Sequence, residues 1–341
     1  MVGNSADDSA IMDLLDKQIV HGLVVDARIP FARLGAILGV SEQTVARRYR
    51  SLRQRGIIHV SGQVNMTPLG QARWLLRIRT TPSRAVALAE SLARVPDLSW
   101  VSLLSTGFEV TCVGRPRSIE RRDELLLRMV PNAGQVQNMN IYEVMRVFPF
   151  AEEWPRYGRL LSAEQLRELG PPQPSRREPD GPDAPVTLSR EDEAMLALLA
   201  RDGRAPYAQI AAVTGWSANR AARRMHELTA AGVLYFDLDF ALERMGFQTR
   251  GMLWLRVRPA HLEAVGIAIS RHQEVAFVAA TTGVANMIVS VECVDIAHLY
   301  RYVTESLGAL EGIEDIEVTL ALRVFKQQQT LLTSKRIAVG R

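Results

Sequence analysis

Two short stretches of the sequence place long polar side chains at helical spacing, where they could bind base edges or phosphates. Each stretch begins with a serine, Ser41 or Ser217, whose hydroxyl can accept a hydrogen bond from a free backbone N–H in the first helical turn. The side chains that would point outward are mostly amide and guanidinium donors, which contacts in the DNA major groove require. They are Gln43, Thr44, Arg47 and Arg50 in the first stretch and Asn219, Arg220, Arg223 and His226 in the second.

The opposite face of each predicted helix is apolar. At 3.6 residues per turn, one stripe holds Val45, Tyr49 and Leu52, and its counterpart holds Ala221, Met225 and Leu228. Arg48 and Arg224 fall beside these stripes, so a DNA contact and a structural hydrogen bond are both open for them. For Arg47 and Arg223 the alternative to DNA contact is a solvated helix face.

The chain is a tandem duplication. Asp26-Ala-Arg-Ile-Pro-Phe-Ala-Arg-Leu34 matches Asp202-Gly-Arg-Ala-Pro-Tyr-Ala-Gln-Ile210 at an offset of 176 residues, and Ser105-Thr106-Gly107 aligns with Thr281-Thr282-Gly283 at the same offset. Arg146-Val-Phe148 aligns with Arg323-Val-Phe325 at an offset of 177. The stretch between the copies, Pro171 to Pro185, is dense in proline and charge and predicts a semi-extended linker.

Each copy has two parts. The first is a helix, a break, a short helix, a turn and a third helix, followed by a strand at Gly56–Val60 or Gly232–Phe236, which predicts a winged helix-turn-helix. The second alternates strand and helix patterns as βαββαβ, a ferredoxin-like sandwich. The fold class is therefore α+β, with two winged helix-turn-helix domains and two ferredoxin-like sensing domains in tandem. The expected boundaries are 9–65 and 70–150 for the two domains of the first copy, and 187–240 and 247–328 for those of the second. Residues 151–186 between them are expected to hold a short helix and the linker, and the capping-box sequence Ser162 to Gln165 opens that helix.

Composition excludes several classes of protein. Only Cys112 and Cys293 are present, too few for a disulfide framework or a four-ligand zinc site, so a reducing cytoplasm is expected. Residues 1–170 hold 22 Lys and Arg against 17 Asp and Glu, whereas residues 171–341 hold 19 against 20. The first half is thus the better candidate for binding a polyanion. We expect no catalytic residues, no metal site, no cofactor and no membrane partner.

The chain resembles the Lrp/AsnC family of feast/famine transcription regulators, twice over. The elements that carry the resemblance are Leu15-Asp16-Lys-Gln-Ile19, Asp26-Ala-Arg28, Ser41 with Arg48, and Leu52 followed by Gly56-Ile57-Ile58. The resemblance implies a winged helix-turn-helix joined to a ligand-binding domain that pairs through its sheets and often binds amino acids. It places the effector near Thr106 and Gly107, and near Thr282 and Gly283, although a Thr-Gly pair can also be plain turn chemistry. The family commonly has an acidic residue three positions beyond the Gly; here those positions hold Val110 and Asn286.

Other functions stay open. Siroheme decarboxylases resemble this family and also occur as fused pairs, but they would need a His-Asn-Tyr stretch where this chain has Trp100–Leu104 and Ala276–Ala280. Alternatively, the second helix-turn-helix serves assembly only. The favoured prediction is a regulator that binds double-stranded DNA, modulated by an amino acid or another small metabolite. Its two sensing domains would pair within one chain, and such pseudo-dimeric chains would form a homo-oligomer.

Overall fold

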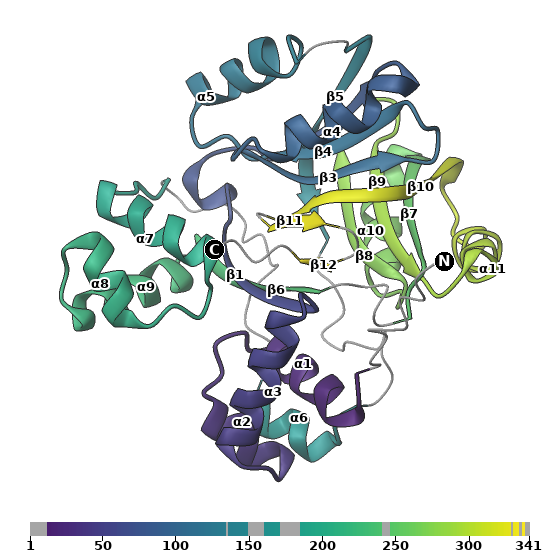
Figure 1. Ribbon diagram of the computed structural model, residues 1–341. Coiled ribbons are helices and arrows are strands. Elements are labelled where there is room, and N and C mark those ends of the chain that lie inside the picture. The colour runs from purple at the N-terminus through teal and green to yellow at the C-terminus, as the bar shows by residue number, and fades with distance from the viewer. Residues whose placement is uncertain are drawn as a thin grey trace, which may run out of the picture.

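The computed structural model describes residues 12–133, 136–148, 160–170, 185–240, 246–328, 330–333 and 336–337. Residues 171–184, most of the expected linker, lie outside these ranges. Two helical units lie below and to the left of a larger body of sheets and helices (Figure 1). None of the described helices is both long and apolar enough to cross a membrane.

Each helical unit has three helices and one strand, as predicted. Helix breaks fall at Pro30 and Pro206, which precede the second helices, and at Gly39 and Gly215, which end them with positive φ angles of 70° and 72°. The first unit comprises α1 (Leu14–Val25), α2 (Phe31–Leu38), α3 (Glu42–Gln54) and β1 (Ile58–Val64). The second comprises α7 (Arg190–Arg201), α8 (Tyr207–Thr214), α9 (Ala218–Ala230) and β6 (Leu234–Phe240).

The two strands that follow the third helices pair with each other. β1 and β6 form an antiparallel two-stranded sheet, in register from Ile58 opposite Phe240 to Val64 opposite Leu234. Each wing strand therefore finds its partner in the other copy of the repeat. One apolar core joins both helical units, because buried residues from β1 and β6 belong to the same cluster as those of the six helices.

The predicted short helix before the linker is α6 (Ala163–Leu169). Ser162 and Gln165 form the expected capping box, in which each side chain accepts a hydrogen bond from the other residue's backbone N–H. Gln165 Nε2 also donates to the Ile37 carbonyl at 3.0 Å, so α6 packs on the first helical unit beside α2.

Two βαββαβ units form the larger body. The first comprises β2 (Trp74–Arg79), α4 (Ala85–Ala93), β3 (Leu98–Leu104), β4 (Glu109–Gly114), α5 (Ile119–Asp123) continued by a π-helical segment (Glu124–Met129), and β5 (Asn138–Val147). The second comprises β7 (Thr249–Val257), α10 (Leu262–Ser270), β8 (Val275–Thr281), β9 (Met287–Cys293), α11 (Ile296–Arg301) with its π-helical segment (Tyr302–Leu307), and β10 (Ile313–Gln327). Two short strands follow, β11 (Thr330–Thr333) and β12 (Arg336–Ile337).

The last strand of each unit crosses to the other unit. β5 pairs with β2 over Asn138–Glu143 and then with β8 over Val144–Val147. β10 pairs with β7 over Ile313–Leu320 and then with β3 over Ala321–Lys326. The two sheets thus close on each other within a single chain, as the duplication predicted. Each unit has its own core under its helices, and a small cluster of Leu75, Tyr142, Trp254 and Ile288 fills the space between the sheets.

Candidate DNA-binding and effector sites

Helix α3 is held to its unit by the predicted apolar stripe. Val45, Tyr49 and Leu52 are all buried, and the Ser41 hydroxyl accepts a hydrogen bond from Thr44 N at 3.2 Å. The hydroxyls of Ser41 and Thr44 are also hydrogen-bonded to each other at 2.9 Å. Of the four side chains predicted to point outward, Gln43, Arg47 and Arg50 are exposed, whereas Thr44 is only partly exposed.

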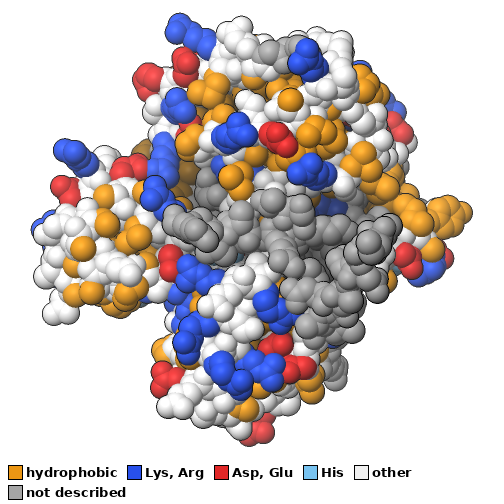
Figure 2. All heavy atoms as spheres, viewed as in Figure 1, with side chains coloured by type: hydrophobic (Ala, Val, Ile, Leu, Met, Phe, Trp, Pro, Cys, Tyr) orange, Lys and Arg blue, Asp and Glu red, His pale blue; other side chains and the backbone are white. Residues whose placement is uncertain are grey.

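Helix α9 repeats this arrangement with different side chains. Ala221, Met225 and Leu228 are buried, and the Ser217 hydroxyl accepts from Arg220 N at 3.3 Å. The four side chains predicted to point outward, Asn219, Arg220, Arg223 and His226, are all exposed. Basic side chains gather over the module that contains α2, α3 and α6 (Figure 2), which fits the charge excess of the first half.

Arg48 and Arg224 make structural contacts at equivalent places. Arg48 Nη1 lies 2.7 Å from Asp13 Oδ2 and 3.3 Å from Asp16 Oδ1, at the start of α1. Arg224 donates from Nε and Nη2 to the two carboxylate oxygens of Asp192 on α7, both at 2.8 Å. The hydrogen bond to Asp192 raises the pKa of Arg224. Both arginines therefore join the third helix to the first.

Arg28 and Arg204, which occupy matching positions in the two copies of the repeat, link the two helical units. Arg28 donates to the carbonyls of Gly203 and Ala205, which flank Arg204. Arg204 in turn donates to the carbonyls that flank Arg28, at 2.7 and 2.8 Å. The guanidinium of Arg204 also stacks over Phe31, with 4.3 Å between Cζ and the ring centroid. These contacts fix how one unit sits against the other, and so position α3 relative to α9.

The Thr-Gly turns contact the crossing strands of the opposite unit. Thr282 N donates to the Glu143 carbonyl at 3.0 Å, and the Thr282 hydroxyl accepts from Glu143 N at 2.9 Å. Ser105 makes the same two bonds with Leu320, at 2.7 and 3.0 Å. The structural counterpart of Thr282 is therefore Ser105, which corrects the alignment of Thr282 with Thr106. The offset within the sensing units is 177 residues.

The threonine hydroxyls of the two candidate effector turns differ in whether they have a hydrogen-bond partner. The Thr282 hydroxyl is engaged with Glu143, whereas Thr106 Oγ1 is buried and has no hydrogen-bond partner among the described residues. Gly107 and Gly283 both have positive φ, 77° and 99°. A Cβ on Gly283 would lie 2.9 Å from the Tyr142 ring, so this turn is packed against the first unit. The four predicted effector residues thus lie on two turns, each of which contacts the opposite unit's long strand.

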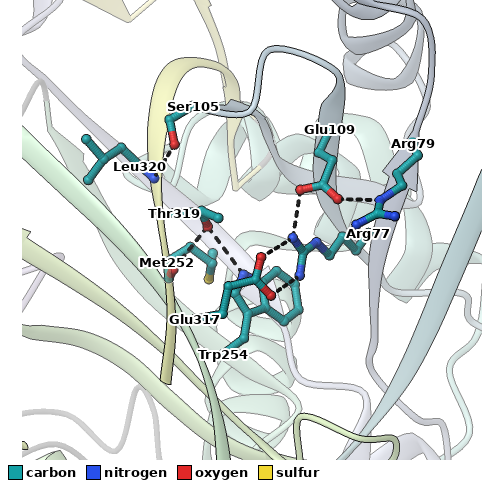
Figure 3. Close-up of polar contacts among 9 residues, drawn as sticks. All are labelled: Arg77, Arg79, Ser105, Glu109, Met252, Trp254, Glu317, Thr319 and Leu320. Atoms are coloured by element: carbon teal, nitrogen blue, oxygen red, sulfur yellow. Dashed lines mark hydrogen bonds and ion pairs between the residues drawn. The ribbon is translucent and has the colours of Figure 1, made fainter. Parts of the chain in front are cut away.

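The corrected offset reveals an acidic residue that the sequence analysis missed. Asn286 corresponds to Glu109, one position before Val110, and Glu109 is fully buried. Its carboxylate accepts from Arg77 Nη2 and Arg79 Nε, both at 2.7 Å (Figure 3). Arg77 also donates to both carboxylate oxygens of Glu317 on β10, at 2.8 and 2.6 Å. These hydrogen bonds raise the pKa of Arg77 and lower that of Glu317.

Gln328, which follows β10, and Thr330 on β11 connect the second βαββαβ unit to the two-stranded sheet. Gln328 Nε2 donates to Asp237 Oδ2 at 3.1 Å, and the Thr330 hydroxyl donates to Asp239 Oδ2 at 3.2 Å, both on β6. Lys326 is buried and donates to the Val95 carbonyl at 2.9 Å. Burial lowers the pKa of Lys326 to about 8. The contact between this segment and β6 is polar, whereas the side chains of β1 and β6 that pack against the helices are apolar.

Family models match three parts of the chain. The AsnC-type helix-turn-helix domain matches residues 12–53 and again residues 188–229, and the Lrp/AsnC ligand binding domain matches residues 251–331. The chain belongs to the Lrp/AsnC family. The repeated helix-turn-helix match agrees with a tandem duplication of that family's architecture.

Curated relatives correspond in length to one half of this tandem Lrp/AsnC chain. The HTH-type transcriptional regulator FL11 of Pyrococcus horikoshii is 23% identical over 147 residues, which are 43% of this chain and 97% of that protein. The HTH-type transcriptional regulator Ptr1 of Methanocaldococcus jannaschii is 26% identical over 140 residues, which are 41% of this chain and 95% of that protein.

A solved structure matches the whole tandem arrangement. The siroheme decarboxylase NirDL superposes with a TM-score of 0.60 over 94% of this chain and 95% of that one, at 13% sequence identity. At this identity the likeness concerns the fold alone. His272, the histidine nearest in sequence to Ala276–Ala280, is partly buried, and its Nδ1 lies 3.2 Å from the Tyr302 hydroxyl. Because Tyr302 belongs to the core under the helices, His272 lies away from the space between the sheets.

Proposed function

We propose that this chain is a sequence-specific DNA-binding transcription regulator whose recognition helices are α3 and α9. The observation that carries the proposal is the pair of helices with buried apolar stripes and exposed donor faces, fixed to one another through Arg28 and Arg204. The regulators FL11 and Ptr1 support it by name. The two cysteines are buried free thiols, which suits action in a reducing cytoplasm.

DNA binding can be tested with the double variant Arg47→Ala, Arg223→Ala. Both side chains are exposed on the donor faces, so we expect a large loss of affinity for duplex fragments selected by the wild-type chain. The affinity of the wild type should fall with salt at a log-log slope of about −0.9 per phosphate contacted. Arg84→Ala removes an exposed arginine of the sensing body and serves as the control for net charge. Unchanged binding by the double variant would contradict the proposal.

The single variants distinguish a regulator with two DNA-binding helices from one in which α9 serves assembly only. Arg223 lies 3.7 Å from Glu227, and Arg224 also contacts Glu227, so α9 carries an acidic neighbour that partly offsets its charge. If both helices bind DNA, Arg223→Ala alone weakens binding. If only Arg47→Ala does so, α9 acts in assembly.

We propose further that a small metabolite, such as an amino acid, binds beside the Thr106 turn. The support is the buried Thr106 hydroxyl oxygen, which has no partner in the described part of the chain and belongs to the turn that leads into Glu109, whose carboxylate binds Arg77 and Arg79. A thermal-shift screen of amino acids and small metabolites tests this proposal. Stabilisation of the wild type but not of Thr106→Val would support it, and the absence of any stabilising compound would argue for an effector-free regulator.

A siroheme decarboxylase is the second candidate, because the likeness to NirDL extends over both halves of the chain. The sequence segments that would have to supply His-Asn-Tyr contain no histidine. Incubation of the purified chain with siroheme, followed by mass analysis of the tetrapyrrole, separates the candidates. Loss of carboxyl groups at a rate proportional to protein concentration would favour the enzyme over the regulator.

A further inference from the structure

The interface between the two sensing sheets pairs residues of unlike chemistry at equivalent positions. Arg77 lies opposite Thr111 and Asn140 in the first sheet, and Trp254 lies opposite Ile288 and Glu317 in the second. The two positions are 177 residues apart, the offset of the sensing units. In a symmetric dimer the same residue would occupy both. Here the guanidinium of Arg77 stacks on the ring of Trp254, with 4.7 Å between Cζ and the centroid.

The charges around this stack also differ between the halves. Arg77 is bound by Glu109 of its own half and by both carboxylate oxygens of Glu317 from the other half. At the positions equivalent to Glu109 and Glu317 stand Asn286 and Asn140, which are neutral. The Asn286 amide is occupied, because it accepts from Val257 N at 2.9 Å and donates to Val257 O at 2.8 Å.

The other contacts of Trp254 also join residues that differ between the two copies. Trp254 Nε1 donates to the Thr319 hydroxyl at 3.3 Å, and the ring packs on Tyr142 of the first half at a centroid distance of 5.5 Å. Tyr142 and Thr319 occupy equivalent positions, since they lie opposite Leu75 and Met252. The two copies of the repeat therefore contribute different, complementary side chains to this interface.

We propose that this interface is heterospecific, so that each half recognises the other half and rejects a copy of itself. Two first halves would place Arg77 against Arg77 and would lose Glu317 from both, leaving stacked like charges in a buried site. Two second halves would place Trp254 against Trp254 and leave each Glu317 carboxylate without Arg77. A chain therefore closes on itself, and the order of its two recognition helices is fixed.

The test uses the full chain with a protease site inserted between residues 171 and 184. After cleavage, the protein is unfolded in urea together with an isotope-labelled sample, refolded by dilution, and weighed intact by native mass spectrometry. We expect only pairs of one first half with one second half, with the label scrambled between them. Like pairs in statistical proportion would overturn the proposal.

A variant of the uncleaved chain tests the same idea without refolding separate halves. Trp254→Arg combined with Glu317→Asn gives the second half the first half's residues at both positions. The control, Trp254→Phe combined with Glu317→Gln, keeps an aromatic ring at position 254 and a polar side chain of the same size at position 317. We expect the first variant to unfold at a clearly lower urea concentration than the control. Equal midpoints would contradict heterospecific pairing.

Discussion

Arg28 and Arg204 each donate hydrogen bonds to the loop that carries the other. The two loops are related by the 176-residue offset, and in each the backbone N–H of the arginine is bound by an aspartate, Asp26 at 2.9 Å or Asp202 at 3.0 Å. The arginines thus make a reciprocal clamp across the shared core of the helical units. The repeat that is visible in the sequence is a symmetric contact in the structure.

Replacing either arginine of the clamp by methionine should destabilise the chain by about 2 kcal/mol, because two buried carbonyls lose a charged donor. Urea denaturation measures this change. We also expect weaker DNA binding, since α3 and α9 lose their fixed relative placement. The double variant should cost less than the sum of the two single variants if the clamp acts as one unit. A pair of single variants with wild-type midpoints would show that the clamp contributes little.

The neighbouring arginines of α3 should separate DNA binding from stability. Arg47 is exposed, and Arg47→Ala should lower the affinity for a specific site by about 1 to 3 kcal/mol if it contacts a base, with an unchanged urea midpoint. Arg48 is bound to Asp13 and Asp16, so Arg48→Ala should lower the midpoint instead. Binding and unfolding measured on both variants check the prediction. The opposite pattern would assign DNA contact to Arg48.

The sequence predicted those elements whose signals are local. Helix caps such as Ser41, the Ser162–Gln165 capping box and the apolar stripe of α3 depend on residues within one or two turns, and all three are present in the structure. The closure of the two sheets followed from the duplication. The ion pair between Arg77 and Glu317 could not be predicted from the sequence. It joins residues 240 positions apart and depends on the register of the four neighbouring strands β10, β3, β4 and β2.

The alignment of the Thr-Gly turns shows how a local match can mislead. Ser105-Thr106-Gly107 and Thr281-Thr282-Gly283 share the same Thr-Gly pair, but hydrogen bonds to the crossing strands equate Ser105 with Thr282. Because the sequence alignment was displaced by one residue, it matched Asn286 with Val110 instead of Glu109. A strand alternates its faces at every residue, so such a shift exchanges a buried carboxylate for a core valine.

The two turn threonines should respond differently to substitution by valine. Thr282→Val removes the acceptor for Glu143 N and should cost about 1 kcal/mol of stability. Thr106→Val replaces a buried hydroxyl without a partner among the described residues, and should be neutral or slightly stabilising in the absence of ligand. Thermal unfolding measures both changes. A marked loss of stability in Thr106→Val would show that its hydroxyl is bonded within the protein.

The buried Lys326 should make the stability of the chain depend on pH in the alkaline range. Its pKa in the folded chain is about 8, below the ordinary lysine value of 10.5, because burial disfavours the charged form. Between these two values the unfolded chain binds more protons than the folded chain, so the free energy of unfolding should rise with pH, by at most about 1.4 kcal/mol per unit. Lys326→Met should lack this rise. Urea midpoints from pH 7.5 to 10.5 for both proteins check it, and parallel profiles would contradict the assigned pKa.

The divergence of α3 and α9, the two proposed recognition helices, predicts an operator with unlike half-sites. A homodimer presents identical helices and selects a palindrome. Here α3 exposes Gln43, Arg47 and Arg50, and the Thr44 hydroxyl is tied to Ser41. On α9 the exposed polar and basic side chains include Asn219, Arg220, Arg223 and His226.

Gln43 and Asn219 can both bind adenine through paired hydrogen bonds, but they differ in reach. Arg220, which stands where α3 has Thr44, offers a donor fork suited to guanine, and its guanidinium lies over the Trp216 ring at 5.0 Å, which orients it at the start of the helix. Arg220→Thr should therefore relax base preference in one half-site and leave the other unchanged. Binding-site selection followed by footprinting measures the two preferences separately. If chains associate further, two asymmetric elements would recur in a larger repeat, whereas a single perfect palindrome with half-sites one helical turn apart would contradict the prediction.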